Sequence, residues 1–131
     1  MSLDARITAF ARADNFAVFT TLRGDGQPVS QPMWVDADDD FVLINTEKHR
    51  RKYRNVQADP RVTVTILDRN NPYVYVEVRG RVVEVVEGPQ ARAHIDTLSQ
   101  KYTGHPYPAD GIKSERVLLK IQPVETSEKQ D

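Results

Sequence analysis

Basic side chains gather in one short segment of this sequence. The segment TEKHRRKYRNVQADPRV, residues 46–62, carries six of them: Lys48, Arg50, Arg51, Lys52, Arg54 and Arg61. Arginine offers a planar fork of donors that fits phosphate, and lysine offers a point charge. The segment therefore indicates an anion-binding site. The anion could be a nucleic acid or the phosphate of a small cofactor, or the segment could be only a basic helix face exposed to water.

The charge of the whole chain favours a small anion. The 131 residues include 18 Lys and Arg and 19 Asp and Glu, for a formal net charge of −1. Domains dedicated to nucleic acid usually carry a basic excess over a whole face. Here the positive charge is local, so we expect no nucleic-acid partner. A nucleic-acid-binding module remains a remote alternative.

The placement of the cluster supports a phosphate site. Residues 41–46, FVLINT, are typical of a buried strand, and residues 50–59, RRKYRNVQAD, can form two to three turns of helix that stop before Pro60. Free N–H groups and the helix dipole favour an anion at such a helix start. We therefore expect four polar side chains at this junction: Asn45, Thr46, Arg50 and Lys52.

Few other residues point to chemistry. The sequence contains no Gly-rich phosphate loop, nucleophile elbow, zinc-protease motif or dinucleotide fingerprint. His49, His94 and His105 lie far apart without metal-ligand spacing, so we predict no metal site. His94 falls on an amphipathic helix and is expected at the boundary of the core rather than as a base. With no cysteine, thiolate chemistry and disulfides are excluded.

Hydrophobic patterning predicts one mainly β domain, 1–131, with helices added. Six strands joined largely by short turns favour an antiparallel sheet that curls into a barrel, with a bulge or bend at Gly80. No apolar run could span a membrane and no secretory signal is found, so we expect no membrane partner and a cytoplasmic protein.

The predicted helices are 3–12, 50–59 and 89–103; the strands are 16–22, 28–35, 41–46, 61–67, 73–86 and 116–121; residues 36–40 are a turn and 126–131 a frayed tail.

The order of several segments resembles a known superfamily. These are TTLRGDGQPVSQPMWV, FVLINTEKHRRKYRNVQADPRV, YVYVEVRGRVVEV, YTGHPYP and ERVLLKIQP. Together they are similar to the pyridoxamine 5'-phosphate oxidase-like, FMN-binding split β-barrels, over about residues 3–124. The resemblance is strongest to small actinobacterial members that use the deazaflavin coenzyme F-420. It implies a six-stranded antiparallel split β-barrel that forms a homodimer, with cofactor grooves between the subunits.

The resemblance also implies roles in cofactor binding. The Arg-x-Lys pair, Arg50 and Lys52, would hold the cofactor phosphate. The strand before it would add polar contacts from Asn45 and Thr46. A second strand segment would run beside the flavin-like ring, with Ser30, Gln31, Pro32, Met33 and Trp34. Two tyrosines, Tyr73 and Tyr75, would approach from the partner subunit, and Arg116 would join the phosphate or tail side.

The activity implied is that of an oxidoreductase. Reduced F-420 would transfer a hydride to a small organic substrate, which loops such as 103–115 would select. The cofactor would carry the chemistry, so no protein nucleophile is needed. The bases beyond the clamp, Lys48, Arg51 and Arg54, favour F-420 because it has a long acidic tail that FMN lacks.

Three alternatives stay open. The first is an FMN-dependent oxidase or reductase of the same fold, and the second is a non-catalytic carrier of the cofactor. The third is the nucleic-acid module already described. Vitamin B6 oxidation is not expected, because the sequence ends VETSEKQD and lacks the Arg- and His-containing motif with which true pyridoxamine phosphate oxidases bind the substrate phosphate.

Overall fold

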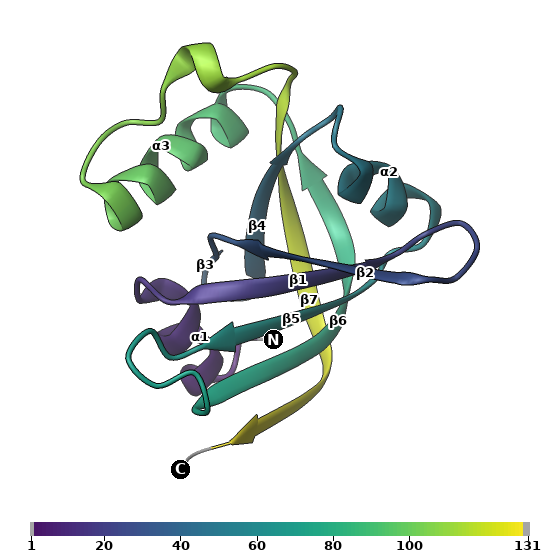
Figure 1. Ribbon diagram of the computed structural model, residues 1–131, viewed down its shortest axis with the longest axis vertical. Helices are drawn as coiled ribbons and strands as arrows, with labels where there is room; N and C mark the ends of the chain where they lie inside the picture. Colours follow the sequence, from purple (N-terminus) through teal and green to yellow (C-terminus); the bar gives the residue numbers. More distant parts are fainter. Residues whose placement is uncertain (1, 130–131) are drawn as a thin grey trace.

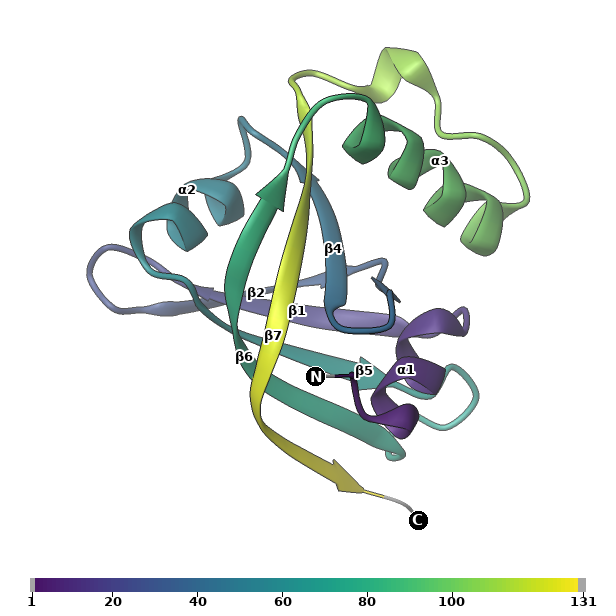
Figure 2. The same cartoon turned by 180° about the vertical axis from the view of Figure 1, so that it is seen from behind.

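Seven antiparallel strands form one curled sheet in the computed structural model, which describes residues 2–129 (Figures 1 and 2). The strand order is β2-β1-β5-β6-β7-β4-β3. The elements are α1 (Ala5–Arg12), β1 (Phe16–Leu22), β2 (Pro28–Met33), β3 (Asp36–Ala37), β4 (Val42–Glu47), α2 (Arg51–Ala58), β5 (Arg61–Leu67), β6 (Tyr75–Val86), α3 (Pro89–Thr103), the short 3-10 helix η1 (Ala109–Gly111) and β7 (Arg116–Lys129).

Alternation of buried and more exposed residues decides which side of each strand faces the core. In β1, Ala17, Phe19 and Thr21 are buried while their neighbours are not, as the two-residue period of a strand requires. β5 has the same pattern. Every residue of β4 is buried, because one face lies in the barrel core and α3 packs over the other through contacts with Leu43.

Two helices, α1 and α2, pack against the main core of the curled sheet. α1 buries Ile7 and Ala11 in the main core, and α2 buries Tyr53 and Val56 in the same core. Burial of a large aliphatic or aromatic side chain stabilises the fold by about 1.5–3 kcal/mol. α2 and α3 lie on either side of the end of β4 (Figures 1 and 2), and this arrangement positions the site described below.

The bend expected at Gly80 is present. The register between β6 and β7 shifts between Arg79 and Gly80. A Cβ atom at Gly80 would lie 2.3 Å from the carbonyl oxygen of Gln122. Only glycine therefore allows the two strands to approach this closely as the sheet coils.

Most element boundaries agree with those predicted, and two predictions were wrong. The sheet has seven strands rather than six, because Asp36 and Ala37, expected in a turn, pair with Leu43 and Val42. The tail is not frayed from residue 126, because β7 continues to Lys129 alongside β6; residues 130–131 of that predicted tail lie outside the described residues. Within residues 2–129, no helix is long and apolar enough to cross a membrane.

Candidate functional site

A cleft of about 350 Å³ opens where β2, β4, α2 and α3 meet. Its lining combines a basic group with an aromatic and aliphatic group. The lining residues are Phe16, Pro32, Met33, Trp34, Asn45, Thr46, Arg50, Lys52, Ile95, Leu98, Tyr107 and Arg116.

Lys52 is the cation of this lining that has no counter-charge beside it among the described residues. It is only 7% exposed, and within the described part of the chain its amino group makes no ion pair or hydrogen bond. Burial lowers the pKa of its amino group, and the positive charges of Arg50 and Arg116 lower it further. A buried cation without a partner is costly, so this part of the cleft favours an anion.

Arg116 is held in place by two neighbouring side chains. Its Nε donates to Oδ1 of Asn45 at 2.9 Å, and its Nη1 lies 3.2 Å from Oε2 of Glu47. The guanidinium also lies over the ring of Tyr107, 5.2 Å from its centre. A guanidinium has five N–H donors, and these two polar contacts use two of them.

Glu47 is a buried carboxylate behind the cleft. It is 1% exposed, and its Oε1 accepts hydrogen bonds from the backbone N–H groups of Lys113 at 2.6 Å and Ser114 at 2.8 Å. Burial alone would raise the pKa of Glu47, but the two backbone hydrogen bonds and Arg116 hold that pKa below its ordinary value. Because Glu47 and Arg116 are paired across β4 and β7, the carboxylate fixes both the arginine and the 113–114 loop.

Aromatic rings form a second wall. Trp34 stacks on Tyr102 with centroids 5.2 Å apart and 7° between the planes, and it meets Tyr107 edge-on at 6.2 Å. The hydroxyl of Tyr102 donates to the Asn15 carbonyl and accepts from the N–H of Val35 at 3.2 Å. The stack is therefore anchored at a polar end, and it offers a fixed apolar surface to a planar group.

Eight of the twelve predicted site residues line this cleft: Pro32, Met33, Trp34, Asn45, Thr46, Arg50, Lys52 and Arg116. Ser30 and Gln31 lie further from it along β2, and Ser30 bonds instead to Thr20 at 2.8 Å. Tyr73 is exposed before β6 and Tyr75 begins that strand. Neither tyrosine lines the cleft of its own chain, and their approach from a partner subunit stays a prediction.

Sequence reasoning missed several lining residues. Phe16 and Tyr107 were not singled out, although the sequence shows an aromatic residue at a predicted strand start and a tyrosine in the 103–115 loop. Ile95 and Leu98 lie on the buried face of α3, and that face also reaches the cleft. No sequence pattern marked Glu47.

One of the bases predicted to meet an acidic tail is already paired. Lys48 bonds to Glu87 and lies 3.2 Å from a carboxylate oxygen of Glu115. Arg54 donates to the carbonyl of His49 at 3.1 Å, and Arg51 is exposed. The surplus positive charge near the cleft is thus smaller than the sequence indicated.

Comparisons with known proteins found a matching family and similar folds. Residues 3–130 match the family described as pyridoxamine 5'-phosphate oxidase. A solved structure described as an F-420 reductase is 33% identical, with a TM-score of 0.79, and the match covers 91% of this chain and 94% of that one.

Two other solved structures show the same fold. A conserved hypothetical protein from Mycobacterium tuberculosis is 25% identical, with a TM-score of 0.75 and coverage of 98% and 84%. A FAD-binding protein from Mesorhizobium loti is 21% identical, with a TM-score of 0.63 and coverage of 99% and 98%. No curated protein sequence matched.

Replacing Glu47 by Gln should destabilise the fold by about 3 kcal/mol near neutral pH, because Arg116 stays buried without its counter-charge. The folded-state pKa of Glu47 is depressed, so its contribution is present above the unfolded pKa of about 4.3 and is lost as pH falls through the folded value. In the Glu47→Gln variant this position has no ionisable side chain, so the variant lacks this contribution to the pH dependence of stability. The difference in free energy of unfolding between the two proteins should therefore shrink as the pH falls.

Urea unfolding at about pH 7 and about pH 3 measures this difference. Glu84→Gln is the matched control, because Glu84 is exposed and its change should have an effect within about 0.5 kcal/mol. An equal loss for Glu47→Gln at both pH values would contradict the assigned role.

Proposed function

Because the chain belongs to the pyridoxamine 5'-phosphate oxidase family, we propose that it binds a flavin-type cofactor in this cleft as an oxidoreductase. The cofactor proposed is the deazaflavin coenzyme F-420, and the reaction is hydride transfer to a small organic substrate. The observation that carries the proposal is the buried, unpaired Lys52 beside Arg50 and Arg116. Such a group of cations suits a phosphate.

The lining of the cleft fits a group that is a ring at one end and a phosphate at the other. Arg50, Lys52 and Arg116 would hold the phosphate, and the segment that ends in Trp34 would lie beside the ring. The reduced cofactor, when bound, supplies the hydride. The protein binds and orients it, and apolar side chains such as Leu98 keep water from the ring.

Arg50→Ala and Lys52→Ala should each weaken FMN binding by about 1.5–3 kcal/mol, since each removes a charge-assisted contact to phosphate. FMN serves as the probe because it shares the ring-ribityl-phosphate layout with F-420. Lys52→Ala should not lower the stability of the cofactor-free protein, because it removes a buried charge that has no partner among residues 2–129.

Fluorescence titration gives the affinities. Arg54→Ala is the matched control: Arg54 lies on the same helix, α2, but is exposed and does not line the cleft. If folded Arg50→Ala and Lys52→Ala proteins bind FMN as tightly as the wild type, the clamp is wrong.

A similar solved structure and the charges near the cleft favour F-420 over FMN. The 33% identical structure is described as an F-420 reductase, and Arg51 and Arg54 remain near the cleft as candidates to attract an acidic tail. The carbon that replaces N5 in a deazaflavin favours two-electron hydride transfer. The similar structure described as a FAD-binding protein is consistent with the FMN alternative. The other alternative, a non-catalytic carrier, would bind the cofactor without turnover.

F-420 should bind more tightly than FMN at low salt, and the gap should narrow as salt rises, because exposed charges such as Arg51 are screened. Since Lys48 is already paired, we expect the narrowing to be small. Paired titrations at two ionic strengths measure it. Tighter FMN binding at both, or a protein purified with FMN bound, would favour the FMN alternative.

We also propose that the active form is a homodimer. Apolar side chains are exposed on two neighbouring inner strands, with Val83 of β6 at 48% and Val124 of β7 at 73%, and Tyr73, two residues before β6 begins, is 71% exposed. Pairing would cover such surface and would let Tyr73 and Tyr75 reach the partner's cleft. Sedimentation at micromolar concentration should give a dimer, and a stable folded monomer that still binds FMN would rule out a shared site.

A further inference from the structure

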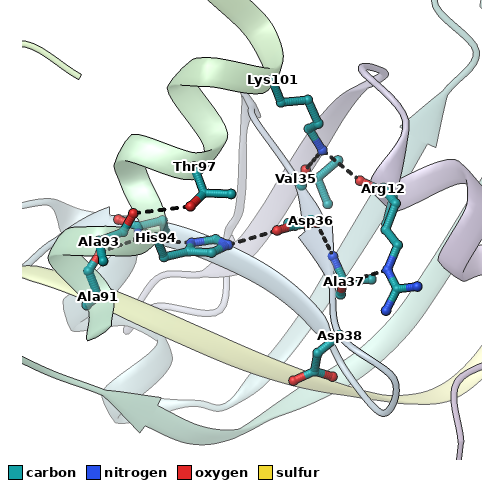
Figure 3. A network of polar contacts seen from close by, with 12 residues as sticks. Arg12, Val35, Asp36, Ala37, Asp38, Ala91, Ala93, His94, Thr97 and Lys101 are labelled. Atoms are coloured by element: carbon teal, nitrogen blue, oxygen red, sulfur yellow. Dashed lines mark hydrogen bonds and ion pairs between the residues drawn. The ribbon is translucent and has the colours of Figure 1, made fainter. Parts of the chain in front are cut away.

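A line of polar contacts runs from β3 to the arginine of the cleft. Nε2 of His94 lies 3.0 Å from Oδ2 of Asp36, and its Nδ1 lies 3.2 Å from Nδ2 of Asn45. Oδ1 of Asn45 in turn accepts from Nε of Arg116. Figure 3 shows the imidazole of His94 between α3 and Asp36. The side chain of His94 is 11% exposed, and the cleft lining does not include it.

The neighbours of Asn45 determine how its amide is turned. Nδ2 donates to the carbonyl oxygen of Ala91 at 2.9 Å, and Oδ1 accepts from Arg116; a carbonyl cannot donate and a guanidinium cannot accept. The second N–H of the amide therefore faces Nδ1 of His94, which must accept. The imidazole proton is then on Nε2 and is donated to Asp36.

We propose that His94 is a positioning residue of the cleft. Its Nδ1 holds the amide of Asn45 in the one orientation that presents Oδ1 to Arg116, and Asp36 selects the tautomer of His94 that can do so. The hydrogen bond made by one ring nitrogen commonly sets the role of the other. The ligand end of this proposal rests on the proposed function, in which Arg116 binds the cofactor phosphate.

The simpler role for His94 would be to fasten α3 to the sheet. α3 has other contacts with the same region: Nζ of Lys101 donates to the carbonyl oxygen of Val35 at 2.5 Å (Figure 3). The same Nζ donates to the carbonyl oxygen of Ala11 at 3.0 Å. The hydroxyl of Tyr102 adds a further bond to Asn15. Because these contacts remain without His94, the helix should stay docked when the imidazole is changed.

Two substitutions separate the two roles. The amide of Asn can place its oxygen near the position of Nδ1, so His94→Asn keeps an acceptor for Asn45 and loses Asp36. The longer Gln reaches the position of Nε2, so His94→Gln keeps a donor to Asp36 and loses the acceptor for Asn45. If His94 positions Asn45, His94→Gln should lose more FMN affinity than His94→Asn. If His94 only fastens α3 to β3, His94→Asn should lose more.

The first measurement is fluorescence titration with FMN and with riboflavin, which lacks the phosphate. His94→Gln should weaken FMN binding roughly three- to ten-fold, the range of one hydrogen bond. His94→Asn should stay within about two-fold, and riboflavin binding should change in neither. His105→Gln, at an exposed loop histidine, is the control. Equal losses of FMN affinity, or a larger loss for His94→Asn, would overturn the proposal.

The second measurement needs no cofactor. The side-chain N–H resonances of Asn45 and Arg116 report their hydrogen bonds in the free protein. In His94→Gln they should shift and exchange faster with solvent, while in His94→Asn they should stay near their wild-type positions. Unchanged resonances in His94→Gln would overturn the proposal by themselves. If the wild type binds neither FMN nor F-420, the proposed function fails, and this measurement still decides the role of His94.

Discussion

The buried ion pair between Glu47 and Arg116 is the interaction on which the cleft depends. Both side chains are almost fully buried, and they face each other across β4 and β7. Removing one partner of such a pair leaves an uncompensated charge, which costs several kcal/mol. The same carboxylate bonds to two backbone N–H groups of the 113–114 loop. One residue therefore sets the position of an arginine and of the loop that leads into β7.

The charge at this end of β4 does not balance within the chain. Three cations line the cleft, and Glu47 is the acid that two of them approach: Arg116 at 3.2 Å and Arg50 at 3.9 Å. Lys52 has no such neighbour among the described residues. An anion bound here would satisfy donors that the fold has already oriented, so little reorganisation would oppose binding. In the proposed function, this arrangement would link the packing of the barrel to the binding of the cofactor phosphate.

Local signals explain why so much of the fold could be predicted. β1 and β5 have the predicted bounds, because alternating burial and flanking turn residues are properties of a short window. The position of Arg50 and Lys52 at a strand-to-helix junction was also predicted from local order, and both residues line the cleft; their role as a phosphate clamp stays a prediction. β3 was missed because its two residues become a strand only through pairing with β4. The extension of β7 was missed for the same reason, since it follows β6.

The contacts that complete the site join residues far apart in the sequence. Asp36 and His94 are 58 residues apart, and Asn45 and Arg116 are 71 apart. Hydrophobic periodicity carries no information about such distant pairs. The sequence analysis therefore placed His94 at the boundary of the core but did not predict its contacts with Asp36 and Asn45.

The structure also changes the meaning of the basic segment from which the sequence analysis began. Lys48 is paired with two glutamates, and Arg61 bonds to Asp59 at 2.7 Å. Arg54 donates to a backbone carbonyl. Of the six basic side chains, Arg50 and Lys52 are the two that line the cleft. A polyanion would need a continuous row of available cations, whereas two cations backed by Arg116 suit a single phosphate. In the folded chain the basic cluster thus separates into two residues that line the cleft, the exposed Arg51, and three residues engaged in ion pairs or a backbone contact.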